Sequence, residues 1–170
     1  MLKSIDYIAV DIGPGSFTGI KVGLAFVKGI SLGRNIPIFA VNSLEGYSFF
    51  APNDKTVLVV VKAGKGMYYF ASFKKSSEEH LCLVFPKIGT LEEVIKEISQ
   101  HERVHIFTIC EDGITTIKAD VLTSSLPPLS KGVGTASIKL FDKDKLITSA
   151  NLTPLYLRVS DAEANLIKQP

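Results

Sequence analysis

A glycine-rich segment near the start of the chain has the clearest potential for chemistry in this sequence. It reads Gly-Pro-Gly-Ser-Phe-Thr-Gly over residues 13–19 and follows a short apolar run, residues 5–12. Gly13 and Gly15 can adopt backbone angles that are closed to other residues, and Pro14 stiffens the turn. Because a helix predicted after the turn would expose its first amide groups, the segment could also cradle an anion such as phosphate.

The two common phosphate-binding motifs do not match this segment. A P-loop requires Lys and then Ser or Thr directly after its last glycine, whereas Ile20 follows Gly19 here. The dinucleotide motif requires its third glycine three positions after the second, and Thr18 holds that position. The residues therefore favour a tight strand-to-helix connection over a phosphate site. We assign this structural turn to Gly13, Pro14, Gly15, Ser16 and Gly19.

Other side chains that could act in catalysis or bind a metal are scattered along the chain. The histidines at positions 80, 101 and 105 have no paired carboxylate at metal-ligand spacing. Ser16 is not flanked as in the G-x-S-x-G motif of hydrolases, so helix capping is its expected role. We therefore predict no catalytic residue, no metal ligand and no cofactor-binding residue.

The helix predicted after the turn is a candidate packing surface. It is expected to run from Thr18 to about Leu32, with Ser16 or Thr18 as its cap and Gly33 as its stop. Gly23 and a second glycine at position 29 weaken this helix by about 1 kcal/mol each relative to alanine. Glycines in a helix often mark the close approach of another element. The apolar positions that follow helical spacing are Ile20, Leu24, Val27 and Ile30.

Strands and helices are expected to alternate through the rest of the chain, which indicates an α/β layer fold. Thr90 and Glu93 have capping-box spacing before a helix that starts near residue 91, and Ser130 is the expected cap of a helix towards Phe141. We expect two lobes, residues 1–52 and 53–170. The strands are predicted at residues 36–41, 56–61, 67–73, 81–85 and 104–109, a short helix at 43–50, and an extended piece at 155–158.

Composition narrows the functional classes. With 46% hydrophobic residues in 170, the chain can bury a sizeable core, and a net charge of +2 does not by itself favour nucleic-acid binding. Cys82 and Cys110 lie in apolar runs and are expected to be buried thiols in a reducing compartment. No signal peptide and no apolar run of membrane-spanning length is recognised, so a cytoplasmic location without membrane contact is expected.

The segment from Gly13 to Gly23 resembles the G-P-G-S-F-T-G-x-R-x-G signature of the TsaB family, the YeaZ-type, glycoprotease-like proteins. Lys21 stands where the family usually has Arg. The sequences Ile-Pro-Ile at 36–38 and Val-Asn-Ser-Leu at 41–44 resemble the strand and helix start that follow in that family. Leu-Tyr-Leu-Arg at 155–158 resembles its closing P-x-Y-L-R element. The resemblance runs from about Ser4 to Ala164.

This resemblance implies an actin-like, sugar-kinase-like (ribonuclease H-like) fold. It also implies a non-catalytic role beside the catalytic subunit TsaD and the ATPase TsaE, which attach threonylcarbamoyl to an adenosine next to the tRNA anticodon. Contact with tRNA would be indirect. In that family the subunit pairs with TsaD, or with itself, through helices of the N-terminal lobe. Carried over to this chain, the contact residues are Thr18, Ile20, Lys21, Gly23, Leu24, Val27 and Gly29.

Two departures from the family pattern limit what can be carried over. The strand with an Asp-Thr-Ser-type turn that comes before the glycine motif is not found here, so we expect an incomplete N-terminal lobe and no nucleotide hydrolysis. Lys62-Ala63-Gly64 stands where the family often has Asp-Ala-Arg. Two alternatives therefore remain beside a scaffold subunit: a glycoprotease-like peptidase, and an inactive truncated fragment that only dimerises.

Overall fold

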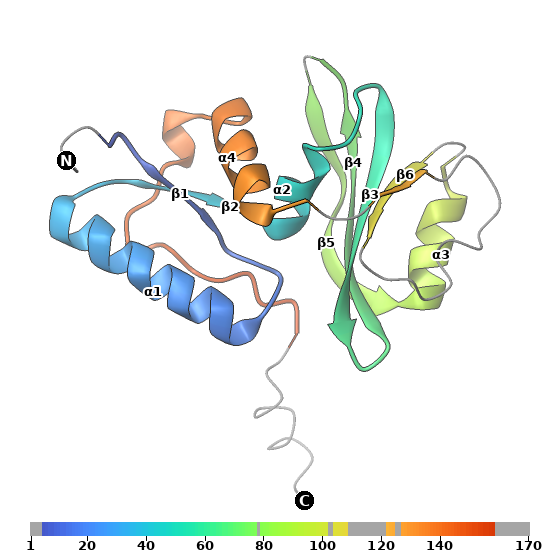
Figure 1. Ribbon diagram of the computed structural model, residues 1–170, viewed down its shortest axis with the longest axis horizontal. Coiled ribbons are helices and arrows are strands. Elements are labelled where there is room, and N and C mark those ends of the chain that lie inside the picture. The colour runs from blue at the N-terminus through green and yellow to red at the C-terminus, as the bar shows by residue number, and fades with distance from the viewer. Residues whose placement is uncertain (1–4, 78, 102–103, 109–121, 125–126, 159–170) are drawn as a thin grey trace, which may run out of the picture.

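The computed structural model describes residues 5–77, 79–101, 104–108, 122–124 and 127–158. These residues form a mixed α/β fold with two sheets, and the elements run in chain order as Figure 1 shows. The elements are β1 (Ile8–Asp11), α1 (Phe17–Arg34), β2 (Ile38–Val41), α2 (Ser43–Ser48), β3 (Lys55–Gly64), β4 (Met67–Lys75), β5 (His80–Thr90), α3 (Leu91–Ser99), β6 (Val104–Thr108), β7 (Leu122–Ser124), α4 (Leu129–Lys139) and the 3₁₀ turn η3 (Lys143–Lys145).

The smaller sheet consists of β1 and β2, which pair in parallel with Ile8 opposite Ile38. Successive side chains of a strand point to opposite faces, so each strand serves two cores. One face packs on α1 and the other on α4, and Figure 1 shows these helices on opposite sides of the two strands. After η3, Ile147 forms a bridge with Ile38, with N···O distances of 2.8 and 2.9 Å. This bridge covers the outer edge of β2.

Local signals explain the start of α1, whereas its end differs from the prediction. The Ser16 hydroxyl accepts a hydrogen bond from the Gly19 amide (3.3 Å), so the predicted cap is confirmed. The helix does not stop before Gly33, which lies inside it. It continues to Arg34 and is closed by Asn35, which adopts the left-handed conformation with φ of 54°. Asn is the residue besides Gly that most often tolerates this conformation.

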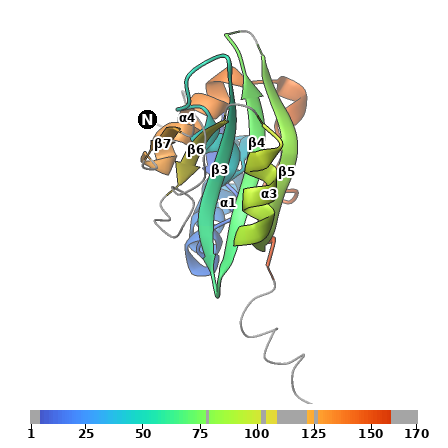
Figure 2. The same ribbon diagram turned by 90° about the vertical axis from the view of Figure 1, so that its right-hand side faces the viewer.

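The larger sheet has five strands in the order β5-β4-β3-β6-β7. The predicted hairpin is confirmed: β3 and β4 pair antiparallel, and β3 also pairs in parallel with β6. The run Val57–Val60 is completely buried because both faces of β3 are covered. Figure 2 looks onto the face covered by α3, and α2 packs on the opposite face.

A close contact between α2 and α4 joins the parts of the molecule that carry the two sheets. A Cβ atom built on Gly132 would lie 2.5 Å from the carbonyl oxygen of Gly46, so only glycine fits there. Residues 129–152 thus return to the small sheet, where Leu152 is fully buried against α1. The expected division after residue 52 stays a prediction, and any such division must assign this returning segment to the first lobe.

Four further predictions concern the remaining elements and have different outcomes. The Thr90–Glu93 capping box is confirmed, because Thr90 N–H donates to the Glu93 carboxylate (2.7 Å) and Glu93 N–H donates to the Thr90 hydroxyl (3.4 Å). β5 extends well beyond the predicted residues 81–85 because it pairs with β4 along its whole length. The cap of α4 is Pro128 and not Ser130, and Pro128 makes no side-chain capping bond. The segment 155–158 forms no named strand.

Candidate functional site

The glycine turn is held by a steric requirement at Gly13. This residue has φ of 99°, and a Cβ atom there would lie 2.7 Å from Cδ1 of Ile20 and 3.2 Å from the carbonyl oxygen of Leu155. The expected special backbone angle is therefore confirmed for Gly13. It is not found at Gly15, where a Cβ would meet only Ile20 at 3.9 Å. The turn thus brings the start of α1 against the C-terminal segment near Leu155.

The Asp11 carboxylate ties this turn to the start of α2. One oxygen accepts hydrogen bonds from the Gly13 amide (3.0 Å) and the Ser43 hydroxyl (2.8 Å), and the Ser43 amide donates to the Gly13 carbonyl (2.8 Å). Burial raises the pKa of Asp11 above its usual value, and the two donated hydrogen bonds offset part of that rise. The Asp11 carboxylate therefore stabilises the turn through these hydrogen bonds.

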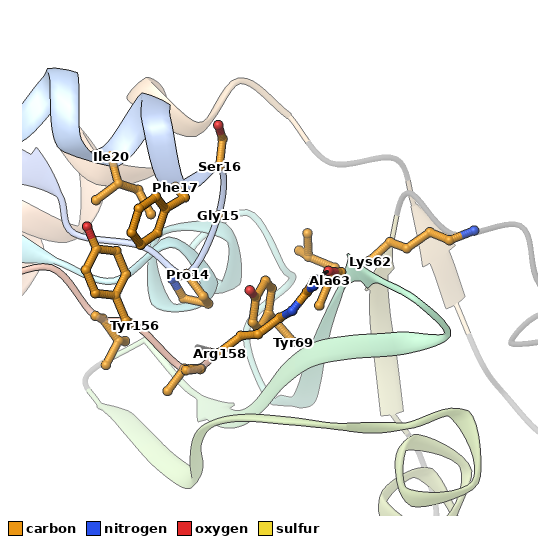
Figure 3. A pocket seen from close by; sticks show the side chains of 14 residues that line it. Pro14, Gly15, Ser16, Phe17, Ile20, Lys62, Ala63, Tyr69, Tyr156 and Arg158 are labelled. Atoms are coloured by element: carbon orange, nitrogen blue, oxygen red, sulfur yellow. Dashed lines mark hydrogen bonds between the residues drawn. The ribbon is translucent and has the colours of Figure 1, made fainter. Parts of the chain in front are cut away.

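A pocket of about 440 Å³ opens between the glycine turn and the β3–β4 hairpin. Its walls come from the turn and first residues of α1, the end of β3, and the C-terminal segment 155–158. Phe17 and Tyr156 stack at one end with ring centroids 4.7 Å apart. At the other end, Arg158 donates from Nη1 to the carbonyl oxygen of Ala63 (2.8 Å), next to Tyr69 (Figure 3). Sequence reasoning did not identify this pocket, because its walls lie far apart in the chain.

The predicted contact residues fall on different sides of α1. Ile20, Leu24 and Val27 are buried in the core beneath the helix, so three residues that the resemblance assigns to subunit contact do not face outward. Thr18, Lys21 and Gly29 are exposed, and Gly23 is half-buried. The Lys21 ammonium lies 4.1 Å from the centre of the Phe17 ring. A contact role for the outward-facing residues stays a prediction.

The outer face of α1 carries large apolar side chains that the sequence analysis did not select. Val22, Phe26 and Leu32 are 65%, 69% and 79% exposed. Positions 22, 26, 29 and 33 recur at intervals of three or four residues, directly opposite the buried positions. A Cβ atom on Gly23, Gly29 or Gly33 would meet nothing within 4 Å. A helical projection could have found this second stripe, because α1 is apolar on both of its faces.

A serine–histidine pair lies elsewhere, at the end of α2. Ser48 Oγ and His80 Nε2 are 2.7 Å apart, but Ser48 is 0% exposed and its hydroxyl donates to the Glu45 carbonyl (2.7 Å). Because a hydroxyl has one proton, the His80 ring must donate to Ser48 and cannot act as its base. Burial lowers the pKa of His80 to about 4, assisted by the Lys75 ammonium, which keeps the ring neutral. The pair is structural.

Metal-ligand groups and membrane-spanning helices can be assessed only for the residues that the structure describes. Among these residues, no three His, Cys, Asp or Glu side chains are grouped so that they could hold a metal ion. None of the described helices is both long and apolar enough to cross a bilayer. Cys82 is half-buried, and burial raises the pKa of its thiol. Cys110, the other expected buried thiol, lies outside the described residues.

Comparison with known proteins decides the family. The model of the family described as TsaD, tRNA N6-adenosine threonylcarbamoyltransferase, matches residues 1–155. The chain belongs to the TsaD family, and within it to the TsaB, or YeaZ, type. The matched residues include both the turn at Gly13 and the residues up to Leu155, which the structure brings together.

Relatives within the TsaD family include curated TsaB proteins. The tRNA threonylcarbamoyladenosine biosynthesis protein TsaB of Buchnera aphidicola (subspecies Schizaphis graminum) is 30% identical over 58% of this chain and 50% of its own length. TsaB of Escherichia coli is 26% identical over 92% of this chain and 72% of its own. The chain therefore spans only half the length of the first relative and about three quarters of the second.

Solved structures agree on the fold. YeaZ from Pseudomonas aeruginosa matches with a TM-score of 0.75 and 19% identity, over 92% of this chain and 76% of that protein. A Pseudomonas aeruginosa protein described as similar to peptidase YeaZ matches with a TM-score of 0.76 and 18% identity, over 93% and 76%. The predicted ribonuclease H-like, actin-like fold is therefore confirmed.

Proposed function

We propose that this chain is a non-catalytic scaffold subunit in tRNA threonylcarbamoyladenosine biosynthesis that binds a TsaD-type catalytic subunit through the outer face of α1. The name of its TsaB relatives supports the process. Short matches of 42% and 47% identity to tRNA N6-adenosine threonylcarbamoyltransferases, each over 28% of this chain, support kinship with the proposed partner. A TsaE-type ATPase is a further proposed partner, and tRNA contact is proposed to be indirect.

The observation that carries this proposal is the uncovered apolar stripe of α1. A helix that is apolar on both faces belongs in a protein interior, yet one face here is bare. Val22 and Phe26 stand outward beside Gly29, where the backbone itself forms the surface. Exposed apolar stripes of this kind mark protein–protein contacts. A partner helix could approach closely over Gly29 and cover both side chains.

The non-catalytic part of the proposal rests on what the described side chains do. Asp11 is engaged in the glycine turn, and Ser48 is buried with its proton donated to Glu45. A peptidase would need an accessible nucleophile with a base, and the Ser48–His80 pair supplies neither. We expect the isolated chain to release no phosphate from ATP above a buffer blank. We also expect it to hydrolyse no peptide substrate in the absence of chelators.

The test is co-purification of the full chain with the TsaD-type subunit of the same organism, followed by size-exclusion chromatography. We expect a stoichiometric complex with the unchanged chain. Phe26→Asp places a charge in the middle of the stripe and should weaken the complex about tenfold or more, because buried aromatic residues dominate interfaces. Ile138→Asp is the matched control, since Ile138 on α4 is 72% exposed and Phe26 is 69% exposed.

Two results would decide against this proposal. Co-elution of the Phe26→Asp chain with the TsaD-type subunit at full strength would show that the stripe is not the contact. If the unchanged chain forms only a homodimer that Phe26→Asp disrupts, the alternative of a fragment that only dimerises is favoured. Both conclusions require that the Phe26→Asp chain keeps the circular dichroism spectrum and the unfolding midpoint of the unchanged chain.

A further inference from the structure

The hydroxyl of Tyr69 points into the pocket beside the glycine turn. Tyr69 is only 9% exposed, and within the described residues its hydroxyl has no hydrogen-bond partner. Figure 3 shows the ring beside Arg158 with its oxygen directed towards Pro14. The oxygen is not among the fully buried polar atoms without a partner, so it opens onto the pocket, where a tyrosine hydroxyl can donate or accept a hydrogen bond. The hydroxyl is therefore placed to bind a group that enters the pocket.

The described residues that line the pocket favour an anion over a cation. Among the residues that the structure describes, the fourteen that line the pocket include no Asp or Glu, while Arg158, which donates to the Ala63 carbonyl, supplies a cation. The guanidinium carries several donors in a planar fork that suits carboxylate and phosphate groups. The first turn of α1 adds a partial positive charge on the wall that includes Ser16. In contrast, two other cavities include a carboxylate, Asp54 in one and Glu79 in the other.

The opposite end of the pocket is apolar and aromatic. The stacked rings of Phe17 and Tyr156 line it together with Ile20. Tyr156 is 41% exposed, so its ring offers surface to a ligand. A volume of about 440 Å³ is within the range of small-molecule sites. The polar and aromatic ends thus define a site with two distinct halves.

We propose that this pocket binds a small organic oxyanion, a phosphate or carboxylate carried on a flat apolar ring. The oxyanion lies against the Tyr69 hydroxyl and the Arg158 guanidinium, and the ring lies against Phe17 and Tyr156. Lys62 also lines the pocket, but its side chain points away from the cavity in Figure 3 and is not part of the site. This proposal is independent of the partner proposed for α1, because its test uses the chain alone.

The test is isothermal titration of the full chain with four probes: phenyl phosphate, benzoate, inorganic phosphate and phenol. We expect saturable binding at one site for phenyl phosphate or benzoate, at least about tenfold tighter than for inorganic phosphate or phenol, because only the first two fill both halves. The probe that binds more tightly identifies the oxyanion. If neither binds saturably, or if inorganic phosphate binds as tightly as phenyl phosphate, the proposal is wrong.

Conservative variants then locate the probe. Tyr69→Phe removes only the hydroxyl and should weaken binding about threefold or more, whereas Arg158→Gln should weaken it about tenfold or more. Tyr68→Phe is the matched control, because Tyr68 is the neighbouring residue, is 4% exposed and packs on the opposite face of β4. Arg158→Gln also removes the hydrogen bond to the Ala63 carbonyl and could change the shape of the pocket. The Tyr69→Phe result therefore decides whether the probe binds at the proposed place. Binding that is equal in the Tyr69→Phe and Tyr68→Phe chains would overturn the assignment.

Discussion

The Asp11 carboxylate accepts the hydroxyl hydrogen of Ser43 over 2.8 Å and thereby joins the end of β1 to the start of α2. The same oxygen also binds the Gly13 amide, so one buried group organises the turn before α1 and the turn before α2. Ser43 is 3% exposed and is shielded from water that could replace this bond. The Asp11 carboxylate therefore helps to hold the turn before α1 against the start of α2, together with the bond from the Ser43 amide to the Gly13 carbonyl.

We predict that Asp11→Ala lowers the free energy of unfolding by about 1–3 kcal/mol, because it leaves the Ser43 hydroxyl without its acceptor. Asp11→Asn should cost less, because it keeps an oxygen acceptor and removes the charge that burial disfavours. Urea unfolding followed by circular dichroism measures both. Asp6→Ala, at an exposed position before β1, is the control. Equal losses for the two Asp11 variants would contradict this account of the carboxylate.

The two glycines of the turn should respond differently to alanine. Gly13→Ala should cost more than about 1 kcal/mol, because it combines a positive φ with a close approach to Ile20. Gly15→Ala should be tolerated to within a few tenths of a kcal/mol, because its Cβ meets only one atom, at ordinary contact distance. Thermal and urea unfolding of the two variants, compared side by side, provide the measurement. The prediction fails if the Gly15 variant is the less stable of the two.

Glycines inside helices should separate into two classes. Gly29→Ala should raise the free energy of unfolding by about 0.5–1 kcal/mol, because alanine has the higher helix propensity and a Cβ there meets nothing. Gly132→Ala should lower it by about 1–3 kcal/mol, because its Cβ would overlap the carbonyl of Gly46 in α2. A stabilised Gly132 variant would show that α2 and α4 do not pack as described.

The neutral His80 ring makes stability depend on pH. Its pKa is lowered from 6.5 to about 4, first by burial and then by Lys75. The unfolded chain therefore takes up a proton below about pH 6.5 that the folded chain refuses, so stability is fully present above that pH and falls as the pH drops towards 4. Between about pH 7.5 and about pH 5, the loss should reach up to about 2 kcal/mol.

His80→Phe tests this assignment. A phenyl ring can keep the stacking on Phe49 and Phe73, and the Ser48 hydroxyl keeps its bond to Glu45. We expect the variant to lose much less stability between the two pH values, measured by urea unfolding in matched buffers. If the unchanged chain and the variant lose the same amount, the pH dependence has another origin.

Features governed by neighbours in the chain could be predicted from the sequence. Ser16 caps α1 and Thr90 forms the capping box with Glu93, because a cap depends on groups only three residues away. The run Val57–Val60 is buried on both faces, as its continuous apolar character predicts. The glycine segment indicated the family for the same reason, because the whole turn is formed by consecutive residues, 13–19.

Tertiary structure alone decided which apolar and glycine positions are covered. Ile20 and Phe26 are both large apolar residues of α1, yet the first is buried and the second is exposed, because the small sheet covers only one side of the helix. Gly132 permits a close approach and Gly29 meets nothing, although both are helical glycines. The pocket joins Tyr69 to Arg158 across 89 positions of sequence. Such contacts depend on which distant segment packs against a residue in the folded chain. Patterns among neighbouring residues do not determine this.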